Sequence, residues 1–226
     1  MATPARTARL VIFDCDGVLV DSEPISIAVL LDLIGKAGGS VSEEQAYRLF
    51  LGRSMAAVRE VLRAEFALTL SDHQLADMRA ELMRRFRGQL QPVAGIAETL
   101  ARLDIACCVA SSGSLDRIRL SLGLTGLLEM LEPHLYSASM VTKGKPAPDL
   151  FLHAARHMGV APADCVVIED SPAGIDAAHS AGMRVFAFAG ASHAGHRTLV
   201  AELAMRRPDR TFSDMRQLPD MLAGKR

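Results

Sequence analysis

The sequence has no marked excess of charge of either sign. Its 226 residues contain 25 Lys and Arg against 26 Asp and Glu. This balance excludes the strong positive field that would hold a protein on nucleic acid or on an anionic membrane. We therefore expect a small molecule as the partner, with no nucleic acid and no membrane, and a chain that is a monomer or a weak homodimer.

Signal and membrane segments are also lacking. Residues 1–6 have no apolar stretch of the kind found in secretory signals, and no segment approaches the roughly 20 apolar residues that cross a bilayer. These absences predict a cytoplasmic protein. The four cysteines have no C-x-x-C spacing, and Cys107, Cys108 and Cys165 lie inside apolar runs. We expect buried free thiols rather than metal ligands.

The fold class follows from the way short and long apolar patterns alternate. Short runs rich in branched residues are separated by longer amphipathic stretches, which is typical of a parallel sheet covered by helices. We predict a doubly wound α/β fold, similar to a Rossmann fold. The predicted strands are Leu10–Phe13, Ile105–Ala110, Val166–Ile168 and Arg184–Phe188, with a weaker candidate near Leu135 and Tyr136.

A long segment between the first two predicted strands, residues 21–91, has helical rather than strand spacing. Two sets of apolar residues recur there at intervals that place them on one helical face. The sets are Val58, Val61, Leu62 and Phe66, and Leu75, Met78, Leu82 and Phe86. We predict a helical cap domain at residues 21–91, inserted into an α/β core domain formed by residues 1–20 and 92–226.

Two carboxylates, Asp14 and Asp16, stand where the first predicted strand ends. Extended backbone directs residues i and i+2 to the same side, and Gly17 then allows the chain to turn sharply. Two such carboxylates repel each other unless a positive charge lies between them. A hard divalent cation is the natural candidate, because it prefers carboxylate and carbonyl oxygens.

Polar residues also follow the later predicted strands. Ser111 and Ser112 offer hydroxyls and loop amides that can bind phosphoryl oxygens, and Glu169 and Asp170 add two more acids. Lys145 precedes a proline that disfavours helical backbone, so it is held extended, where it can offset the acids and grip phosphate. Ligands of open α/β sheets bind beyond the carboxyl ends of the strands, so we expect these groups to meet there.

The motifs Asp14-Cys15-Asp16-Gly17, Ser111, Lys145-Pro146 and Glu169-Asp170 resemble, in this order, the four motifs of the haloacid dehalogenase superfamily. Residues 17–24, 145–149 and 169–174 resemble the subgroup that contains β-phosphoglucomutase and many sugar-phosphate phosphatases. The resemblance implies a hydrolase of phosphate monoesters that depends on Mg²⁺. Its substrate would be a small phosphorylated metabolite, either a sugar phosphate or the phosphate of a sugar acid.

The resemblance also implies a role for each matching residue. Asp14 would attack phosphorus and form an aspartyl-phosphate, while Asp16 would act as general acid and then as general base. Mg²⁺ would be held by the Asp14 side chain, the Asp16 backbone carbonyl and Asp170. Glu169 would act outside the metal's own ligands or through a water molecule.

Ser111, Ser112 and Lys145 would hold the phosphoryl oxygens, because positioning and electrostatic stabilisation carry most of the catalysis in phosphoryl transfer. Residues 51–54 resemble the family's substrate-facing loop between two cap helices. Within this loop, Arg53 is our candidate for a contact to a carboxylate or a second phosphate.

Other interpretations compete with this one. Singly, the aspartates could cap a turn, Ser111 could cap a helix and Lys145 could lie in a solvated loop. A phosphosugar mutase is the first alternative, although Ser26 stands where β-phosphoglucomutase has a cap histidine. A non-catalytic sensor of phosphometabolites is the second. Two histidines, His193 and His196, are spaced like metal ligands, but no third ligand is nearby.

Overall fold

A computed structural model of the chain describes residues 7–224 except residues 52, 54 and 193–196. Its centre is a six-stranded sheet in which every neighbouring pair of strands is parallel, with the order β3-β2-β1-β4-β5-β6. The strands are β1 (Leu10–Phe13), β2 (Ala106–Ser111), β3 (Leu135–Ser137), β4 (Cys165–Glu169), β5 (Arg184–Phe188) and β6 (Arg210–Phe212). The predicted doubly wound α/β class is confirmed.

The five strands expected from the sequence are present, and their ends differ from the predicted ones by at most one residue. The sixth strand, β6, was not predicted. It is a three-residue edge strand in which only Phe212 is buried, while Arg210 and Thr211 are exposed. A strand this short and polar leaves no apolar run in the sequence.

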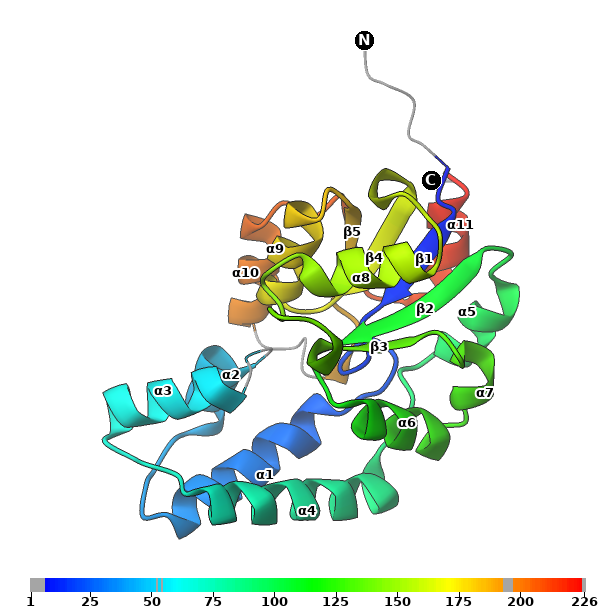
Figure 1. The fold of residues 1–226 in the computed structure, drawn as a ribbon. Coiled ribbons are helices and arrows are strands. Elements are labelled where there is room, and N and C mark those ends of the chain that lie inside the picture. The colour runs from blue at the N-terminus through cyan, green and yellow to red at the C-terminus, as the bar shows by residue number, and fades with distance from the viewer. Residues whose placement is uncertain (1–6, 52, 54, 193–196, 225–226) are drawn as a thin grey trace.

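The helices divide into a group that covers the sheet and a group that lies below it in Figure 1. Those around the sheet are α5 (Ile96–Arg102), α6 (Leu115–Leu124), α7 (Leu128–Leu131), α8 (Asp149–His157), α9 (Pro172–Ser180), α10 (Arg197–Met205) and α11 (Leu218–Leu222). The other group, between β1 and β2 in the chain, consists of α1 (Glu23–Lys36), α2 (Glu43–Phe50), α3 (Met55–Phe66) and α4 (Asp72–Gln89). We call this second group the cap.

Side chains of β1 alternate between two apolar clusters, one on each face of the sheet. Val11 and Phe13 belong to a cluster that includes residues of α6 and α11, whereas Leu10 and Ile12 belong to a cluster that includes residues of α8 and α9. Every residue of β1 is buried. The strand is therefore covered on both sides, as expected for a central strand of a parallel sheet.

The cap helices begin and pack as their sequence indicates. Ser42 and Ser71 each form a reciprocal capping box, with Gln45 and Gln74 respectively, which fixes the start of α2 and of α4. The four apolar residues that define the predicted face of α4 are all buried, namely Leu75, Met78, Leu82 and Phe86. On α3, Val58 and Leu62 are buried and their two companions are partly buried.

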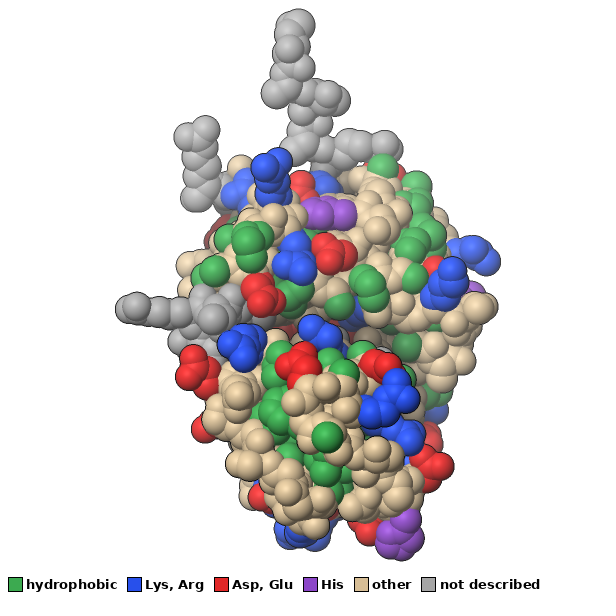
Figure 2. All heavy atoms as spheres, turned by 90° about the vertical axis from the view of Figure 1, so that its left-hand side faces the viewer, with side chains coloured by type: hydrophobic (Ala, Val, Ile, Leu, Met, Phe, Trp, Pro, Cys, Tyr) green, Lys and Arg blue, Asp and Glu red, His purple; other side chains and the backbone are tan. Residues whose placement is uncertain are grey.

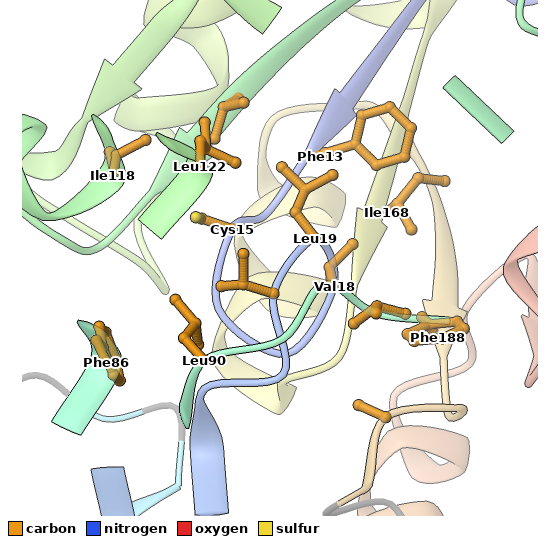
Figure 3. Close-up of a cluster of buried hydrophobic side chains, with 14 of the residues drawn as sticks. Phe13, Cys15, Val18, Leu19, Phe86, Leu90, Ile118, Leu122, Ile168 and Phe188 are labelled. Carbon is orange, nitrogen blue, oxygen red and sulfur yellow. The ribbon is translucent and has the colours of Figure 1, made fainter. Parts of the chain in front are cut away.

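The cap and the sheet share one apolar cluster. Figure 3 shows Phe86 and Leu90, at the end of α4, in the same group of side chains as Cys15, Ile118 and Leu122. The two linkers between cap and sheet are paired: Val20 bridges to Pro92, and the amide of Asp21 donates to the carbonyl of Gln91 at 2.9 Å. The domain boundaries at residues 20–21 and 91–92 stay a prediction.

Two expectations about composition can be compared with the structure. All four cysteines are free. Cys108 and Cys165 are buried, as expected, and so is Cys15, whereas Cys107 is only half-buried. In the described part of the chain, no helix combines the length and the apolar character that crossing a membrane would require.

Candidate active site

The candidate site lies where the sheet reverses its strand order. The chain moves outward from β1 to β2 and β3, then returns to β4 on the other side of β1. Asp14 follows β1 and Asp170 follows β4, so the two acids flank this switch point, where open α/β sheets bind their ligands. Gly17 has a φ of 76°, which supplies the sharp turn after Asp16.

Lys145 connects two of the predicted acids. Its Nζ donates to Oδ1 of Asp14 at 2.8 Å and to Oε1 of Glu169 at 2.6 Å. The Lys145 side chain is 4% exposed, and its ammonium lies 5.0 Å from the centre of the Phe151 ring. An ammonium group has three N–H donors, so one remains for a ligand after these two bonds.

Burial and charge act on Asp14 in opposite directions. Burial raises the pKa of its carboxyl well above the ordinary value, Lys145 lowers it, and the nearby Glu169 and Asp170 raise it further. Burial also disfavours the charge on Lys145, but the Asp14 and Glu169 carboxylates outweigh it and raise the pKa of the ammonium. Lys145 is therefore a permanent cation beside an acid that burial pushes towards its neutral form.

Glu169 is completely buried, and both of its carboxylate oxygens have protein partners. Oε1 accepts from Lys145, and Oε2 accepts from the amides of Asp170 and Ser171 and from the Ser171 hydroxyl, at 2.9–3.0 Å. Gly174 packs directly on this carboxylate, because a Cβ at Gly174 would lie 1.9 Å from Cδ of Glu169. The structure thus holds Glu169 against Lys145.

Carboxylate oxygens of Asp14, Glu169 and Asp170 lie within 4.8 Å of one another, close enough to surround one metal ion. All three residues are buried. Both Glu169 oxygens already accept several hydrogen bonds, so Glu169 is poorly placed to bind an ion directly. A donor set of oxygens alone suits Mg²⁺ or Ca²⁺ rather than a soft metal.

Asp16 has different surroundings from Asp14, although the two are only two residues apart. Its Oδ1 accepts from the Ser22 hydroxyl at 2.6 Å and from Nη2 of Arg117 at 2.8 Å. Its side chain is 17% exposed. Asp14 is thus paired with an ammonium beside the acid cluster, whereas Asp16 is paired with a guanidinium and a hydroxyl.

Sequence reasoning missed Ser22 and Arg117. Ser22 reads as an ordinary residue before a helix, but it is fully buried. Arg117 is the third residue of α6. A cation in the first turn of a helix opposes the helix dipole, and that unfavourable position is the signal that could have indicated a buried carboxylate partner.

Ser111 and Ser112 lie at the carboxyl end of β2, as expected. The Ser111 hydroxyl accepts from the amide of Gly113 at 3.0 Å, which leaves its own proton free for donation, and the residue is buried. Ser112 is exposed. The loop that follows β2 is anchored to the end of β3, because the Ser137 hydroxyl donates to the carbonyl of Gly113 at 2.6 Å.

A pocket of about 760 Å³ brings most of the predicted residues together between the sheet and the cap. Figure 2 shows acidic and basic side chains along the seam between these two parts of the molecule. From the sheet side the lining includes Asp14, Asp16, Ser111, Ser112, Lys145 and Asp170. From the cap it includes Arg53, Arg79, Arg87 and several apolar residues. Two neighbours of Arg53, Gly52 and Ser54, and the histidines His193 and His196 lie outside the described residues.

Comparison with known proteins places the chain in a family. The model of the haloacid dehalogenase-like hydrolases matches residues 8–182. The 6-phosphogluconate phosphatase of Escherichia coli K12 is 30% identical over 212 residues and covers 93% of each chain. Hexitol phosphatase A of the same organism is 30% identical over 194 residues, 78% of this chain and 81% of its own.

A solved haloacid dehalogenase-like protein of unknown function from Agrobacterium tumefaciens C58 has the same fold. It superposes with a TM-score of 0.85 at 36% identity, over 96% of this chain and 98% of its own. The chain belongs to the haloacid dehalogenase-like hydrolases and is therefore an enzyme. The two curated relatives named above, which it matches over most of their length, are phosphatases.

Gly174 offers a test of the contact that holds Glu169. In Gly174→Ala the added methyl group must displace the Glu169 carboxylate, which is anchored by four hydrogen bonds. Overpacking a core of this kind costs about 1–3 kcal/mol, so we expect the free energy of unfolding to fall by that amount in urea titrations. Gly35→Ala in α1 is the matched control, because nothing lies within 4 Å of its added Cβ. Equal stability of the two variants would contradict the contact.

Asp14 offers a test of the charge balance. In Asp14→Asn we expect the metal-free protein, measured in EDTA at pH 7, to unfold about 2–4 °C higher than wild type, the shift that ~1 kcal/mol produces in a chain of this size. The raised pKa of Asp14 means that its ionisation disfavours the folded state. This penalty is present above the raised pKa and is lost as the pH falls below the unfolded value near 3.8.

The difference in unfolding temperature should therefore shrink towards zero as the pH is lowered. Asp104→Asn provides the control, since Asp104 is exposed and does not belong to the buried acid cluster. An Asp14→Asn variant that is less stable than wild type at pH 7 would show that pairing with Lys145 outweighs burial.

Proposed function

We propose that the protein is a Mg²⁺-dependent phosphatase that hydrolyses a phosphorylated sugar or sugar acid through an aspartyl-phosphate on Asp14. The observation that carries the proposal is the contrast between Asp14 and Asp16 within one pocket. Asp14 lies in the buried acid cluster beside Lys145, and Asp16 lies in a separate polar environment. Pairs of carboxyl groups with different environments are typical of sites that divide nucleophilic and acid–base roles.

The residues present fit a divalent cation. Three buried carboxylates face one ammonium, and burial raises the pKa of Asp14 in the absence of a further positive charge. Asp14, Asp170 and the backbone carbonyl of Asp16 would hold the ion. When bound, Mg²⁺ supplies a positive charge that neutralises the acids and stabilises the negative charge of the phosphoryl group.

In the first half of the proposed reaction, an Oδ atom of Asp14 attacks phosphorus and the bond from phosphorus to the sugar oxygen breaks. Asp16 gives a proton to the departing oxygen, which leaves as an alcohol. Lys145 and Ser111 donate hydrogen bonds to the phosphoryl oxygens, since each retains a donor after its contacts within the protein.

In the second half, a water molecule attacks phosphorus and the bond from phosphorus to Asp14 breaks. Asp16, now a carboxylate, takes a proton from that water, so both Asp14 and Asp16 return to their starting forms and inorganic phosphate is released. Glu169 touches neither the water nor the phosphoryl group in this scheme. Its part is to hold Lys145 in place through the 2.6 Å contact.

The substrate class rests on the relatives and on the cap. The two curated relatives are named for 6-phosphogluconate and for hexitol phosphates. Arg53, Arg79 and Arg87 line the cap side of the pocket. Such a lining suits a polyhydroxylated substrate with a further anionic group, and Arg53 is our candidate for the contact.

One residue, Ser26, favours hydrolysis over a mutase reaction. Ser26, which stands where β-phosphoglucomutase has its cap histidine, lines the pocket and is half-buried. Its hydroxyl oxygen is shielded from solvent and has no hydrogen-bond partner within the described residues. A serine hydroxyl does not exchange protons near neutral pH as an imidazole does. We therefore propose water, rather than a second sugar hydroxyl, as the acceptor.

The first test is phosphate release from 6-phosphogluconate, fructose 1-phosphate, sorbitol 6-phosphate and glycerol 2-phosphate. We expect release in Mg²⁺, no release in EDTA, and a loss of at least about 10⁴-fold in Asp14→Asn, because the nucleophile is removed. Asp104→Asn should behave as wild type.

Two outcomes would replace the proposal. Turnover that requires a sugar bisphosphate and keeps the phosphate on the product would indicate a mutase. Binding of these compounds without release, by wild type in Mg²⁺, would indicate a sensor.

Arg53 yields a separate prediction. We expect Arg53→Gln to raise KM for 6-phosphogluconate by about 10-fold with little change in kcat, because a charge-assisted contact distant from the reacting atoms contributes mainly to binding. Arg63→Gln is the control, since Arg63 lies on the outer face of α3, 67% exposed and paired with Glu60. An unchanged KM in Arg53→Gln would place the substrate contact elsewhere.

A further inference from the structure

Arg117 has no part in the scheme above, yet it contacts one of its two central residues. Nη2 donates to Oδ1 of Asp16 at 2.8 Å, and the guanidinium lies 5.3 Å from the centre of the Phe86 ring. Nε is buried and has no hydrogen-bond partner among the described residues. The guanidinium is thus held by Asp16 and by the Phe86 ring, and its Nε is shielded from water.

The position of Arg117 is unfavourable for a positive charge unless an interaction with Asp16 compensates for it. It lies in the first turn of α6, where the helix dipole disfavours positive charge, and most of its side chain is removed from water. The ion pair with Asp16 offsets these costs, and the charge of Glu23 also favours the guanidinium. An arginine with only a packing role has no need of this charge.

Arg117 and Ser22 both bind the same oxygen of Asp16. With Oδ1 held by two donors, Oδ2 is the oxygen that can exchange a proton with a ligand in the pocket. Two donors on one oxygen also fix the rotation of the carboxylate. Proton transfer depends on such a fixed direction, because a general acid must lie within hydrogen-bond reach of the leaving oxygen.

One donor, Ser22, lies at the entry to the cap, and the other, Arg117 of α6, packs on Phe86 near the exit from the cap. Ser22 immediately precedes α1, and Phe86, beneath the Arg117 guanidinium, lies near the end of α4. Figure 3 shows Phe86 next to Leu90, which begins the return linker. The contacts of Asp16 therefore join it to both ends of the cap.

We propose that Arg117 is a positioning residue: seated on Phe86, it orients the Asp16 carboxylate for proton transfer to the leaving group. This inference rests on the proposed function, in which Asp16 is the general acid. It assigns Arg117 no contact with the phosphoryl group, and it makes the Phe86 ring part of the support of Asp16.

The test compares two leaving groups in kcat/KM, which reports the steps up to departure of the alcohol. An alkyl phosphate needs a proton on its leaving oxygen, whereas p-nitrophenyl phosphate releases a stable phenolate without one. We expect Arg117→Gln to lower kcat/KM for the best alkyl phosphate of the panel by about 10–100-fold, the usual cost of a misplaced catalytic group. The value for p-nitrophenyl phosphate should fall by no more than about threefold, since no acid is required there.

Further variants separate positioning from stability. Arg117→Lys keeps the charge and should recover part of the alkyl phosphate rate, while Phe86→Leu keeps an apolar side chain without the ring and should show a smaller loss with the same preference. Arg119→Gln is the matched control on the same helix, because Arg119 is 52% exposed and pairs with Glu132. If Arg117→Gln does not fold, Arg117→Lys and Phe86→Leu decide the question. For each of them, the loss of kcat/KM for the alkyl phosphate is compared with the loss for p-nitrophenyl phosphate.

Equal losses for both phosphates in these variants would overturn the inference, because they would indicate a structural or phosphate-binding role. Asp16→Asn, measured alongside, separates the two levels of the argument. If Asp16→Asn fails to discriminate between the leaving groups, the proposed function itself is wrong. If Asp16→Asn discriminates and Arg117→Gln does not, only the role of Arg117 is wrong.

Discussion

The buried ammonium of Lys145 is the interaction on which the rest of the site depends. Asp14, Glu169 and Asp170 lie within a few ångströms of one another in the interior, where uncompensated negative charges are costly. One cation between Asp14 and Glu169 allows this arrangement to form. The surrounding structure fixes that cation, through the Phe151 ring on one side and a Glu169 carboxylate closely packed by Gly174 on the other. The remaining negative charge is what the Mg²⁺ ion proposed above would offset.

Asp16 lies in surroundings that differ from those of the buried acid cluster around Lys145. Its partners are a guanidinium and a hydroxyl rather than an ammonium in the acid cluster, and it remains partly exposed at the pocket. Two neighbouring aspartates on one strand end thus obtain different environments because Gly17 turns the chain between β1 and the cap. The difference arises from the loop geometry, and it gives the two carboxylates different chemical capacities.

Much of the fold could be predicted from the sequence because its signals are local. Four buried apolar runs mark the central strands, and the helical face of α4 is evident from residue spacing. The positions of Asp14, Ser111, Lys145 and Asp170 at one edge follow from the rule that parallel strands present their carboxyl ends together. Arg117 and Ser22 could not be found in this way. Their contacts with Asp16 depend on the turn at Gly17 and on how α6 meets the end of α4, which are tertiary features. The edge strand β6 could not be predicted, because only one of its residues is buried and the sequence there has no apolar run.

The apolar cluster shared by the cap and the sheet has a consequence for how such enzymes diversify. A cap that touched the sheet only through flexible linkers could be exchanged freely between relatives. Here Phe86 and Leu90 pack among Cys15, Ile118 and Leu122, and the linkers pair through Val20 and Pro92. A transplanted cap must therefore bring an end of α4 that fits this particular surface. Specificity can vary with least disturbance at cap residues that line the pocket but lie outside this junction, such as Arg53.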